Sequence, residues 1–240
     1  MSHTSFRIRA PLLTSIKLGQ FPVALDKLLW HCLFLRHGDQ ARAREELDRL
    51  LSREGQVFFA STMRFGTYSG APLIATSTPT VGVMRAESDL SPNQFHWKKR
   101  GGKWTKILLD GGPYKNRLSK SQTYFAPELT WDAVGDGRKV ASLLNYFVTG
   151  VGLDANRGFG AVKGFDLEET DQDTSLFDEE GGVARVMPVS MYEKRTSKSP
   201  HPDDLVHGCL MPPYRGQDST IEEMCVAPER VRRVRLTPRN

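Results

Sequence analysis

Four glycines fall within eleven residues, in the segment GVGLDANRGFG (150–160), between a predicted helix and a predicted strand. Glycine adopts positive φ at little steric cost and allows a backbone to approach a ligand closely. A helix C-cap followed by a tight turn would need only one or two of these glycines. Arg157 lies inside the segment and offers a forked donor for phosphate. The segment therefore predicts a sharply turned loop with the capacity to bind phosphate.

The order of elements around this loop excludes two common nucleotide-binding motifs. A dinucleotide-binding glycine fingerprint follows a strand and opens a helix, whereas these glycines follow a helical pattern (136–150) and precede a strand-like one (161–167). The phosphate loop of nucleotide triphosphatases ends in Gly-Lys-Ser/Thr, and this segment does not. The loop is therefore expected to serve a different fold.

Hydrophobic periodicity predicts an α+β protein. Apolar residues at helical spacing indicate a buried helix over 23–36 that ends at Gly38, and a surface helix over 39–52 capped by Asp39. Strand patterns occur at 5–9, 56–60, 80–86, 122–132, 161–167, 183–192 and 231–236, with Pro188 at an edge or bulge. The resulting order is compatible with a βαββαβ core, which is the ferredoxin-like arrangement.

Charge is distributed unevenly along the chain. The net charge is only +5, with 33 Lys and Arg against 28 Asp and Glu, because residues 166–180 contain eight acids and no base. The rest of the chain is basic enough to attract a polyanion. We expect the acidic stretch to form a solvated loop that points away from any nucleic acid, into solvent or onto a basic partner.

A basic and aromatic segment occupies residues 88–121, which we interpret as a long insertion projecting from the core. A hairpin with Gly101–Gly102 at its turn is expected there. Cations in such a segment neutralise phosphates, and aromatic faces stack on splayed bases. The alternative is a solvated basic hairpin whose aromatic side chains fold back onto the core. Further cations, Arg230, Arg232, Arg233, Arg235 and Arg239, cluster near the C-terminus.

The segment GVGLDANRGFGAVKGFD, centred on Arg157, Gly158, Phe159 and Gly160, resembles the glycine-rich signature of the RAMP proteins, which are RNA-binding subunits of CRISPR effector complexes. The N-terminal IRAPLLTSIKLGQFPVALDKLLWHCLF and the later MPPYRG (211–216) and Cys225 are similar to the RAMP subunit of type IV systems. That subunit is the counterpart of the one that caps the 5′ handle of the crRNA in other systems.

The resemblance implies a single RAMP-like domain over 1–240 with a ferredoxin-like core. A thumb-like insertion would span 88–121, and an acidic loop with a β-rich C-terminal extension would span 166–240. Such a protein is a non-catalytic, cytoplasmic subunit of a bacterial antiviral ribonucleoprotein complex. It grips the crRNA 5′ handle and contacts the backbone RAMP subunits and the large subunit, near the place where target DNA enters.

The RNA-binding residues expected from the loop and the insertion are Gly152, Arg157, Gly158, Phe159, Gly160, Trp97, Lys98, Lys99, Arg100, Lys103, Trp104, Lys106, Lys115 and Arg117. No cofactor or metal is expected. His201, His207, Cys209 and Cys225 lack the paired spacing of a zinc site. No run of about 18 apolar residues occurs, so no membrane span is expected.

Two alternatives remain open at the level of the sequence. The first is a metal-independent crRNA-processing endoribonuclease of the same superfamily, with His96 as the catalytic candidate and Lys98 and Tyr114 as helpers. The second is a general binder of single-stranded nucleic acid unrelated to CRISPR. Specific cleavage in EDTA would identify the first, and preference for the handle sequence would exclude the second.

Overall fold

The computed structural model describes residues 4–19, 22–82, 99–100, 103–104, 117–214 and 223–236. The chain divides into two compact units, one made of residues 1–75 with 124–240 and the other of residues 76–123. Helices and strands are both present in quantity, which confirms the predicted α+β class.

A five-stranded mixed sheet forms the centre of the first unit, in the order β10-β1-β9-β4-β14. Its strands are β1 (Thr4–Pro11), β4 (Arg64–Thr67), β9 (Glu128–Gly135), β10 (Asp166–Glu169) and β14 (Arg233–Arg235). β1 runs antiparallel to both β9 and β10, and β4 runs antiparallel to β9. β14 adds a parallel edge strand beside β4.

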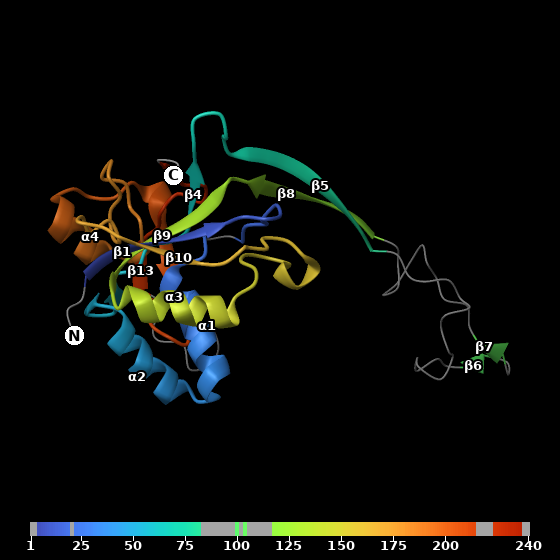
Figure 1. Ribbon diagram of the computed structural model, residues 1–240, viewed down its shortest axis with the longest axis horizontal. Coiled ribbons are helices and arrows are strands. Elements are labelled where there is room, and N and C mark those ends of the chain that lie inside the picture. The colour runs from blue at the N-terminus through green and yellow to red at the C-terminus, as the bar shows by residue number, and fades with distance from the viewer. Residues whose placement is uncertain are drawn as a thin grey trace. The chain divides into compact units, whose positions relative to one another are not determined.

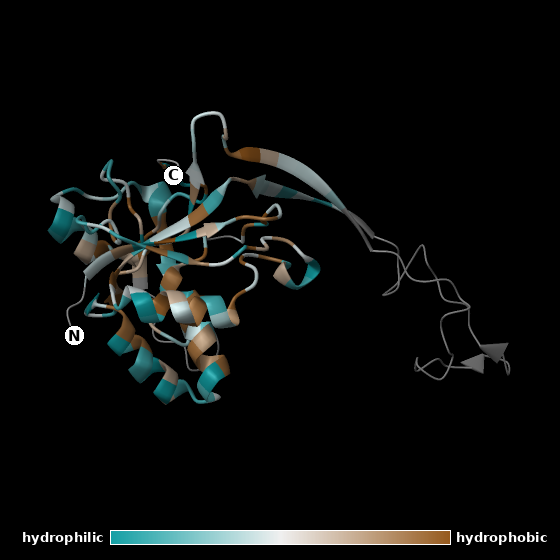
Figure 2. Ribbon diagram, in the orientation of Figure 1, coloured by the Kyte–Doolittle hydropathy of each residue, from teal (hydrophilic) through white to brown (hydrophobic). Residues whose placement is uncertain are grey.

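Three helices lie together on one side of this sheet (Figure 1). They are α1 (Leu25–His37), α2 (Gln40–Leu50) and α3 (Gly137–Phe147). α1 ends as expected at Gly38, whose φ of 64° is left-handed, and the Asp39 side chain caps α2 by accepting from the Arg42 amide. Figure 2 shows mostly hydrophilic residues along α2 and a larger share of hydrophobic residues along α1.

The main hydrophobic core fills the space between these helices and the sheet. Alternate residues of β1 and β9, including Phe6, Ile8, Leu129 and Trp131, are almost fully buried in it. The intervening residues of the same strands point to the opposite face of the sheet. That face is polar and mostly buried, and acidic side chains from the C-terminal half of the chain pair with its arginines.

A second, smaller cluster is built mainly from the C-terminal half of the chain, with Val57 added from the N-terminal half. Its residues Val57, Leu176, Met187, Leu210 and Cys225 are buried together. A three-stranded sheet in the order β11-β13-β12 supports it, with β11 (Met187–Pro188), β12 (Leu205–Gly208) and β13 (Glu223–Val226). β2 (Arg53–Glu54) and β3 (Val57–Phe58) form a short separate ladder. The helix α4 is Val189–Thr196, and the 3₁₀ turns are Ala155–Arg157 and Pro202–Asp204.

A buried ion pair joins the two clusters. Asp26, in the first turn of α1, pairs with Arg185, and the hydroxyl of Tyr214 also donates to Asp26. Asp26 and Arg185 are both almost completely buried. Burial first, and then the Asp26 charge, raises the pKa of Tyr214 well above its usual value. The phenol therefore stays protonated and acts as a hydrogen-bond donor.

The second unit contains most of β5 (Ile74–Gly82) paired with β8 (Arg117–Phe125). Residues 74–75 of β5 and 124–125 of β8 belong to the first unit. It also contains β6 (Lys99–Arg100) paired with β7 (Lys103–Trp104). The partners Lys99↔Trp104 and Arg100↔Lys103 confirm the hairpin expected around Gly101–Gly102.

Several strand boundaries differ from the sequence prediction. The strand expected over 80–86 begins already at Ile74, and residues 83–86 lie outside the described residues. Residues 189–192 are helical, since Pro188 is the N-cap of α4 and its fixed φ suits a helix start. The strand expected over 161–167 begins only at Asp166, so the acidic stretch supplies the edge strand β10. The single strand expected over 122–132 is two strands, because Ala126 and Pro127 separate β8 from β9.

Candidate nucleic-acid interface

The glycine segment forms a compact loop after α3 that contains one 3₁₀ turn, Ala155–Arg157. Gly152, Gly158 and Gly160 have φ values of 95°, 88° and 62°, so each adopts a conformation that residues with a side chain rarely adopt. A Cβ at Gly152 would lie 2.6 Å from the carbonyl oxygen of Lys17, and one at Gly160 would lie 1.9 Å from that of Val151. Gly158 has open space beside it.

These glycines therefore have two different physical roles. Gly152 and Gly160 allow two backbone segments to approach closely, whereas Gly158 permits an exposed left-handed turn with no atom nearby. The Gly158 carbonyl accepts from the Thr14 hydroxyl at 2.7 Å, and that hydroxyl in turn accepts from the Ala161 amide at 2.9 Å. The Thr14 side chain thus holds the two ends of this turn together.

Residues 12–18, which follow β1, anchor the loop along its length. The amide of Gly160 donates to the Ser15 carbonyl at 2.9 Å, and the amide of Leu153 donates to the Lys17 carbonyl at 2.9 Å. The ammonium of Lys17 is 2.8 Å from the Asp154 carboxylate and 4.1 Å from the centre of the Phe159 ring. The ion pair with Lys17 lowers the pKa of Asp154, so this carboxylate stays charged.

Arg157 keeps its guanidinium accessible in this arrangement. Its side chain is 50% exposed, and its Nη1 lies 3.9 Å from Asp154, beyond hydrogen-bonding distance. The backbone of Arg157 is fixed, because its amide donates to the Asp154 carbonyl. A forked donor on a rigid backbone suits the non-bridging oxygens of a phosphate.

Two further cations, one close to the loop in sequence and one from the C-terminal cluster, lie beside residues 11–18. Lys163 is exposed, and its amide donates to the Pro11 carbonyl at the end of β1. Arg230, from the C-terminal cluster, donates to the Leu18 carbonyl at 3.1 Å. Leu13 and Leu153 expose more than half of their side chains on this segment and this loop. The surface therefore combines cations with apolar area, as a surface that contacts both phosphates and bases does.

Most of the predicted RNA-binding residues of the insertion cannot be placed at the site. His96, Trp97, Lys98, Lys106, Tyr114 and Lys115 lie outside the described residues. The structure describes the backbone of Lys99, Arg100, Lys103, Trp104 and Arg117 in strands β6, β7 and β8, but not their side chains. The glycine loop belongs to the first unit, and these strands belong to the second, except for the end of β8.

The acidic stretch 166–180 is not a solvated loop, and this expectation was wrong. Thr174, Ser175 and Leu176 are buried, and Leu176 belongs to the second hydrophobic cluster. Glu168 and Glu179 pair with arginines of the central sheet, and Asp178 pairs with Arg232 just before β14. A run of acids in one part of a sequence does not reveal arginines more than fifty residues away.

Arg9 is the centre of a further polar cluster, on the face of the central sheet opposite the helices. Its guanidinium donates to Glu128 at 2.6 Å, to the Tyr68 hydroxyl at 2.8 Å and to Glu168 at 3.1 Å. Burial and the hydrogen bond to Glu128 both raise the pKa of Tyr68, which donates to that carboxylate. Every charged group of this cluster has a partner. The cluster therefore holds β10 and the turn between β4 and β5 against β1.

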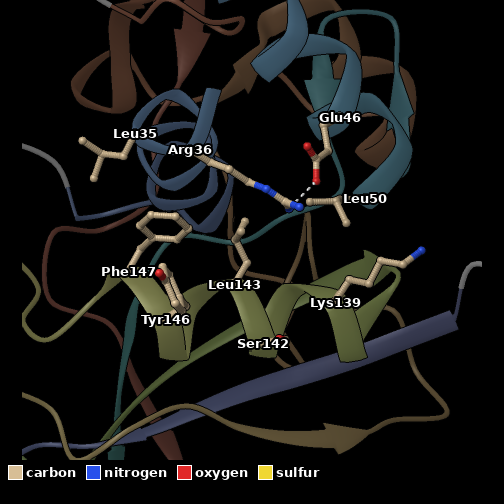
Figure 3. Close-up of a pocket in the computed structure, with 9 residues that line it drawn as sticks. All are labelled: Leu35, Arg36, Glu46, Leu50, Lys139, Ser142, Leu143, Tyr146 and Phe147. Atoms are coloured by element: carbon tan, nitrogen blue, oxygen red, sulfur yellow. Dashed lines mark hydrogen bonds and ion pairs between the residues drawn. The ribbon is translucent and has the colours of Figure 1, made fainter. Parts of the chain in front are cut away.

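A separate hollow of about 590 Å³ lies between the three helices. Leu143, Tyr146 and Phe147 of α3 line it together with Leu35 and Arg36 of α1, and Arg36 pairs with Glu46 of α2 (Figure 3). None of the residues predicted to bind RNA lines this hollow. It is therefore distinct from the surface at the glycine loop.

Within the part of the chain that the structure describes, no three His, Cys, Asp or Glu side chains are grouped to hold a metal ion. None of the described helices combines the length and the hydropathy needed to cross a bilayer. No protein-family model matches the sequence, and no curated protein matches it significantly.

Proposed function

We propose that this protein is a non-catalytic crRNA-binding subunit of a type IV-like CRISPR effector complex, built on a ferredoxin-like RAMP core. Within the central sheet, β10-β1-β9-β4 has the order fourth-first-third-second of a βαββαβ unit. This order and the antiparallel pairing support the ferredoxin-like assignment. The glycine loop follows the second helix of that unit and precedes its last strand.

The observation that carries the proposal is the fixed, exposed turn at Arg157 and Gly158. Among the described residues, this end of the sheet combines a hydrogen-bonded backbone with the exposed cations Arg157 and Lys163. In the proposed mechanism, Arg157 contacts a phosphate of the crRNA 5′ handle, and Lys163 and Arg230 add positive charge beside it. The insertion supplies further phosphate contacts and stacking surfaces, and contacts with backbone and large subunits complete the assembly.

The direct test replaces Arg157 with alanine. Loss of a charged hydrogen bond should weaken binding of handle RNA by about 1–3 kcal/mol, which is roughly a fivefold to 150-fold loss. Arg44→Ala, which removes an exposed cation from α2, is the matched control and should leave affinity within about twofold. Both variants should keep the melting temperature of the parent protein.

Two results would overturn the proposal. Equal handle affinity for folded Arg157→Ala and parent protein would remove the loop from the RNA site. Cleavage of repeat RNA in EDTA, abolished by His96→Ala, would replace the non-catalytic assignment with the endoribonuclease alternative. A scrambled RNA of equal length that binds as tightly as the handle would favour a general single-strand binder.

A further inference from the structure

Two buried arginines and one partly buried arginine lie on the sheet face opposite the helices. Arg7 lies on β1, Arg64 lies on β4, and Arg232 immediately precedes β14. Arg64 and Arg232 are 1% and 5% exposed, which is unusual for a charged side chain. The sheet itself provides one carboxylate among them, Asp132, which pairs with both Arg7 and Arg64.

The acidic stretch provides the other two carboxylates. One oxygen of Glu179 accepts from Arg7 at 2.8 Å, and its second oxygen accepts from Arg64 at 2.8 Å. Asp178 accepts from Arg232 at 2.7 Å. A carboxylate that bridges two guanidinium groups accepts the same pair of charge-assisted hydrogen bonds that the two non-bridging oxygens of a phosphodiester accept.

Charge on this face is balanced only when the acidic stretch is present. Arg7, Arg64 and Arg232 face Asp132, Asp178 and Glu179, so removal of the last two leaves Asp132 as the one carboxylate paired within this group of three arginines. Arg9, beside them, keeps its own carboxylates, Glu128 and Glu168. Such a face would attract a polyanion. We propose that Asp178 and Glu179 act as an internal substitute for a nucleic-acid backbone, which masks these arginines and keeps RNA phosphates off this face of the sheet.

This masking would direct RNA to the glycine loop at the end of the sheet. The choice of RNA as the excluded polyanion rests on the proposed function, whereas the masking contact itself does not. The contact is an autoinhibitory one, because the same arginines that bind the stretch could otherwise bind phosphates without regard to sequence.

The two carboxylates lie on a turn that backbone hydrogen bonds and buried flanking residues also support. The Asp178 amide donates to the Gly182 carbonyl at 2.9 Å, and the Gly182 amide donates to the Asp178 side chain at 2.7 Å. Leu176 and Ala184 are buried on either side of this turn. Isosteric amides at 178 and 179 should therefore weaken the hold on the arginines and favour local opening of this turn, while buried Leu176 and Ala184 keep the flanking chain packed.

The experiment compares two variants of equal charge in the full-length chain. The first is Asp178→Asn with Glu179→Gln, and the second is Asp171→Asn with Glu180→Gln, which changes two exposed acids of the same stretch. The probe is a 20-nucleotide uridine RNA, which contains no handle sequence, and its affinity is measured by fluorescence anisotropy over a series of salt concentrations. Thermal melting of each variant reports whether it is folded.

The first variant should bind the uridine RNA about tenfold more tightly than the second at low salt, because loss of charged hydrogen bonds favours local opening by at least that factor. Its salt slope should be steeper by about 1.5, as two further phosphates are contacted on a single strand. Equal affinities and slopes for the two folded variants would overturn the proposal.

A single-substitution pair keeps the test decisive if the double variant fails to fold. Glu179→Gln should then bind the uridine RNA more tightly than Glu180→Gln, and equal binding overturns the proposal. The result is separable from the test of the proposed function. Loss of handle binding in Arg157→Ala concerns the loop, whereas a gain of uridine-RNA binding here concerns the sheet face, and either can occur without the other.

Discussion

At the scale of single residues, the glycines of the loop are unequal in what they contribute to stability. We predict that Gly160→Ala destabilises the protein more than Gly158→Ala. Both positions have positive φ, which costs a side-chain-bearing residue about 1–2 kcal/mol. At Gly160 the new Cβ would also lie 1.9 Å from the Val151 carbonyl oxygen, and the backbone would have to move to relieve this clash.

The difference is measurable by urea denaturation of the two variants. We expect a loss of about 1–2 kcal/mol for Gly158→Ala. For Gly160→Ala we expect more than about 3 kcal/mol, because the shift also disturbs the hydrogen bond from the Val151 amide to the Gly160 carbonyl. Similar losses for the two variants would show that the close approach of the loop to residue 151 is not needed for stability.

Glu179 provides a prediction about acid stability. Burial alone would raise the pKa of this carboxyl, but a backbone hydrogen bond and the charges of Arg64 and Arg7 outweigh it and lower the pKa from 4.5 to about 2. A lowered folded-state pKa stabilises the protein above the unfolded value, so this contribution is complete above pH 4.5 and is lost as the pH falls towards 2.

Glu179→Gln should therefore flatten the fall in unfolding free energy between pH 4.5 and pH 2. The difference from the parent should be about 1–2 kcal/mol, since the side chain is 43% exposed and solvent screens the pair. Glu180→Gln, which changes the neighbouring exposed acid, is the control and should leave the parent's slope unchanged. Parallel pH profiles for Glu179→Gln and the parent would contradict the assigned pairing.

At the scale of elements, the helices were predictable because their signals are local. The apolar spacing over 23–36, the stop at Gly38 and the cap at Asp39 all act within a few residues of where they appear. The C-terminal elements were harder, because Pro188 suits both a strand edge and a helix start. Only packing against β13 and the second cluster decides between them.

In the candidate site, too, the features set by local sequence were predictable, and the contacts between distant segments were not. Four glycines around an arginine indicated a tight loop, and the positive φ values at three of them confirm that part. The contact of the loop with residues 12–18 joins positions about 140 apart in the chain, and nothing in either segment's pattern specifies it. The pairing of Glu179 with Arg7 and Arg64 was missed for the same reason.

The basic insertion should supply most of the salt dependence of RNA binding. Its cations Lys98, Lys99, Arg100, Lys103 and Lys106 fall within nine positions of the sequence. Replacing all five with alanine should reduce the slope of log affinity against log salt by up to about 3–4 on single-stranded RNA. Filter binding at several salt concentrations measures this slope.

The structure indicates which C-terminal arginines should be replaced as the control in that experiment. Arg232 is paired with Asp178 and buried, so its removal would report on stability as well as on binding. Arg233 and Arg235 are exposed on β14 and provide the cleaner control when both are replaced with alanine. If that pair flattens the slope and the five insertion cations do not, the insertion is not the principal phosphate-binding element.

At the scale of the whole molecule, the central sheet is covered on both faces within the first unit. The helices and the main hydrophobic core cover one face, and the acidic stretch with the second cluster covers the other. Every described residue of the two clusters lies outside 76–123. The first unit therefore has a complete core of its own, whereas the described residues of the second unit add nothing to either cluster.

This division predicts that residues 76–123 can be removed without loss of the fold. Thr76 and Thr123 are hydrogen-bonded through their hydroxyl groups at 2.9 Å, so the chain leaves and re-enters the first unit at adjacent points. An Asn-Gly turn can then join Ala75 directly to Tyr124 as a two-residue hairpin. The Tyr124 end remains anchored, since its backbone exchanges hydrogen bonds of 2.8 and 2.9 Å with Ile16.

The shortened protein should unfold cooperatively, with a free energy of unfolding within about 1–2 kcal/mol of the parent, because a shorter connection between paired strand ends has little entropic cost. Its handle affinity should fall and its salt slope should flatten, while Arg157→Ala should still weaken what binding remains. Urea denaturation and anisotropy on the same samples measure both. A shortened chain that is unfolded would show that the core depends on residues 76–123, and a folded one with full affinity and an unchanged slope would place the phosphate contacts entirely in the first unit.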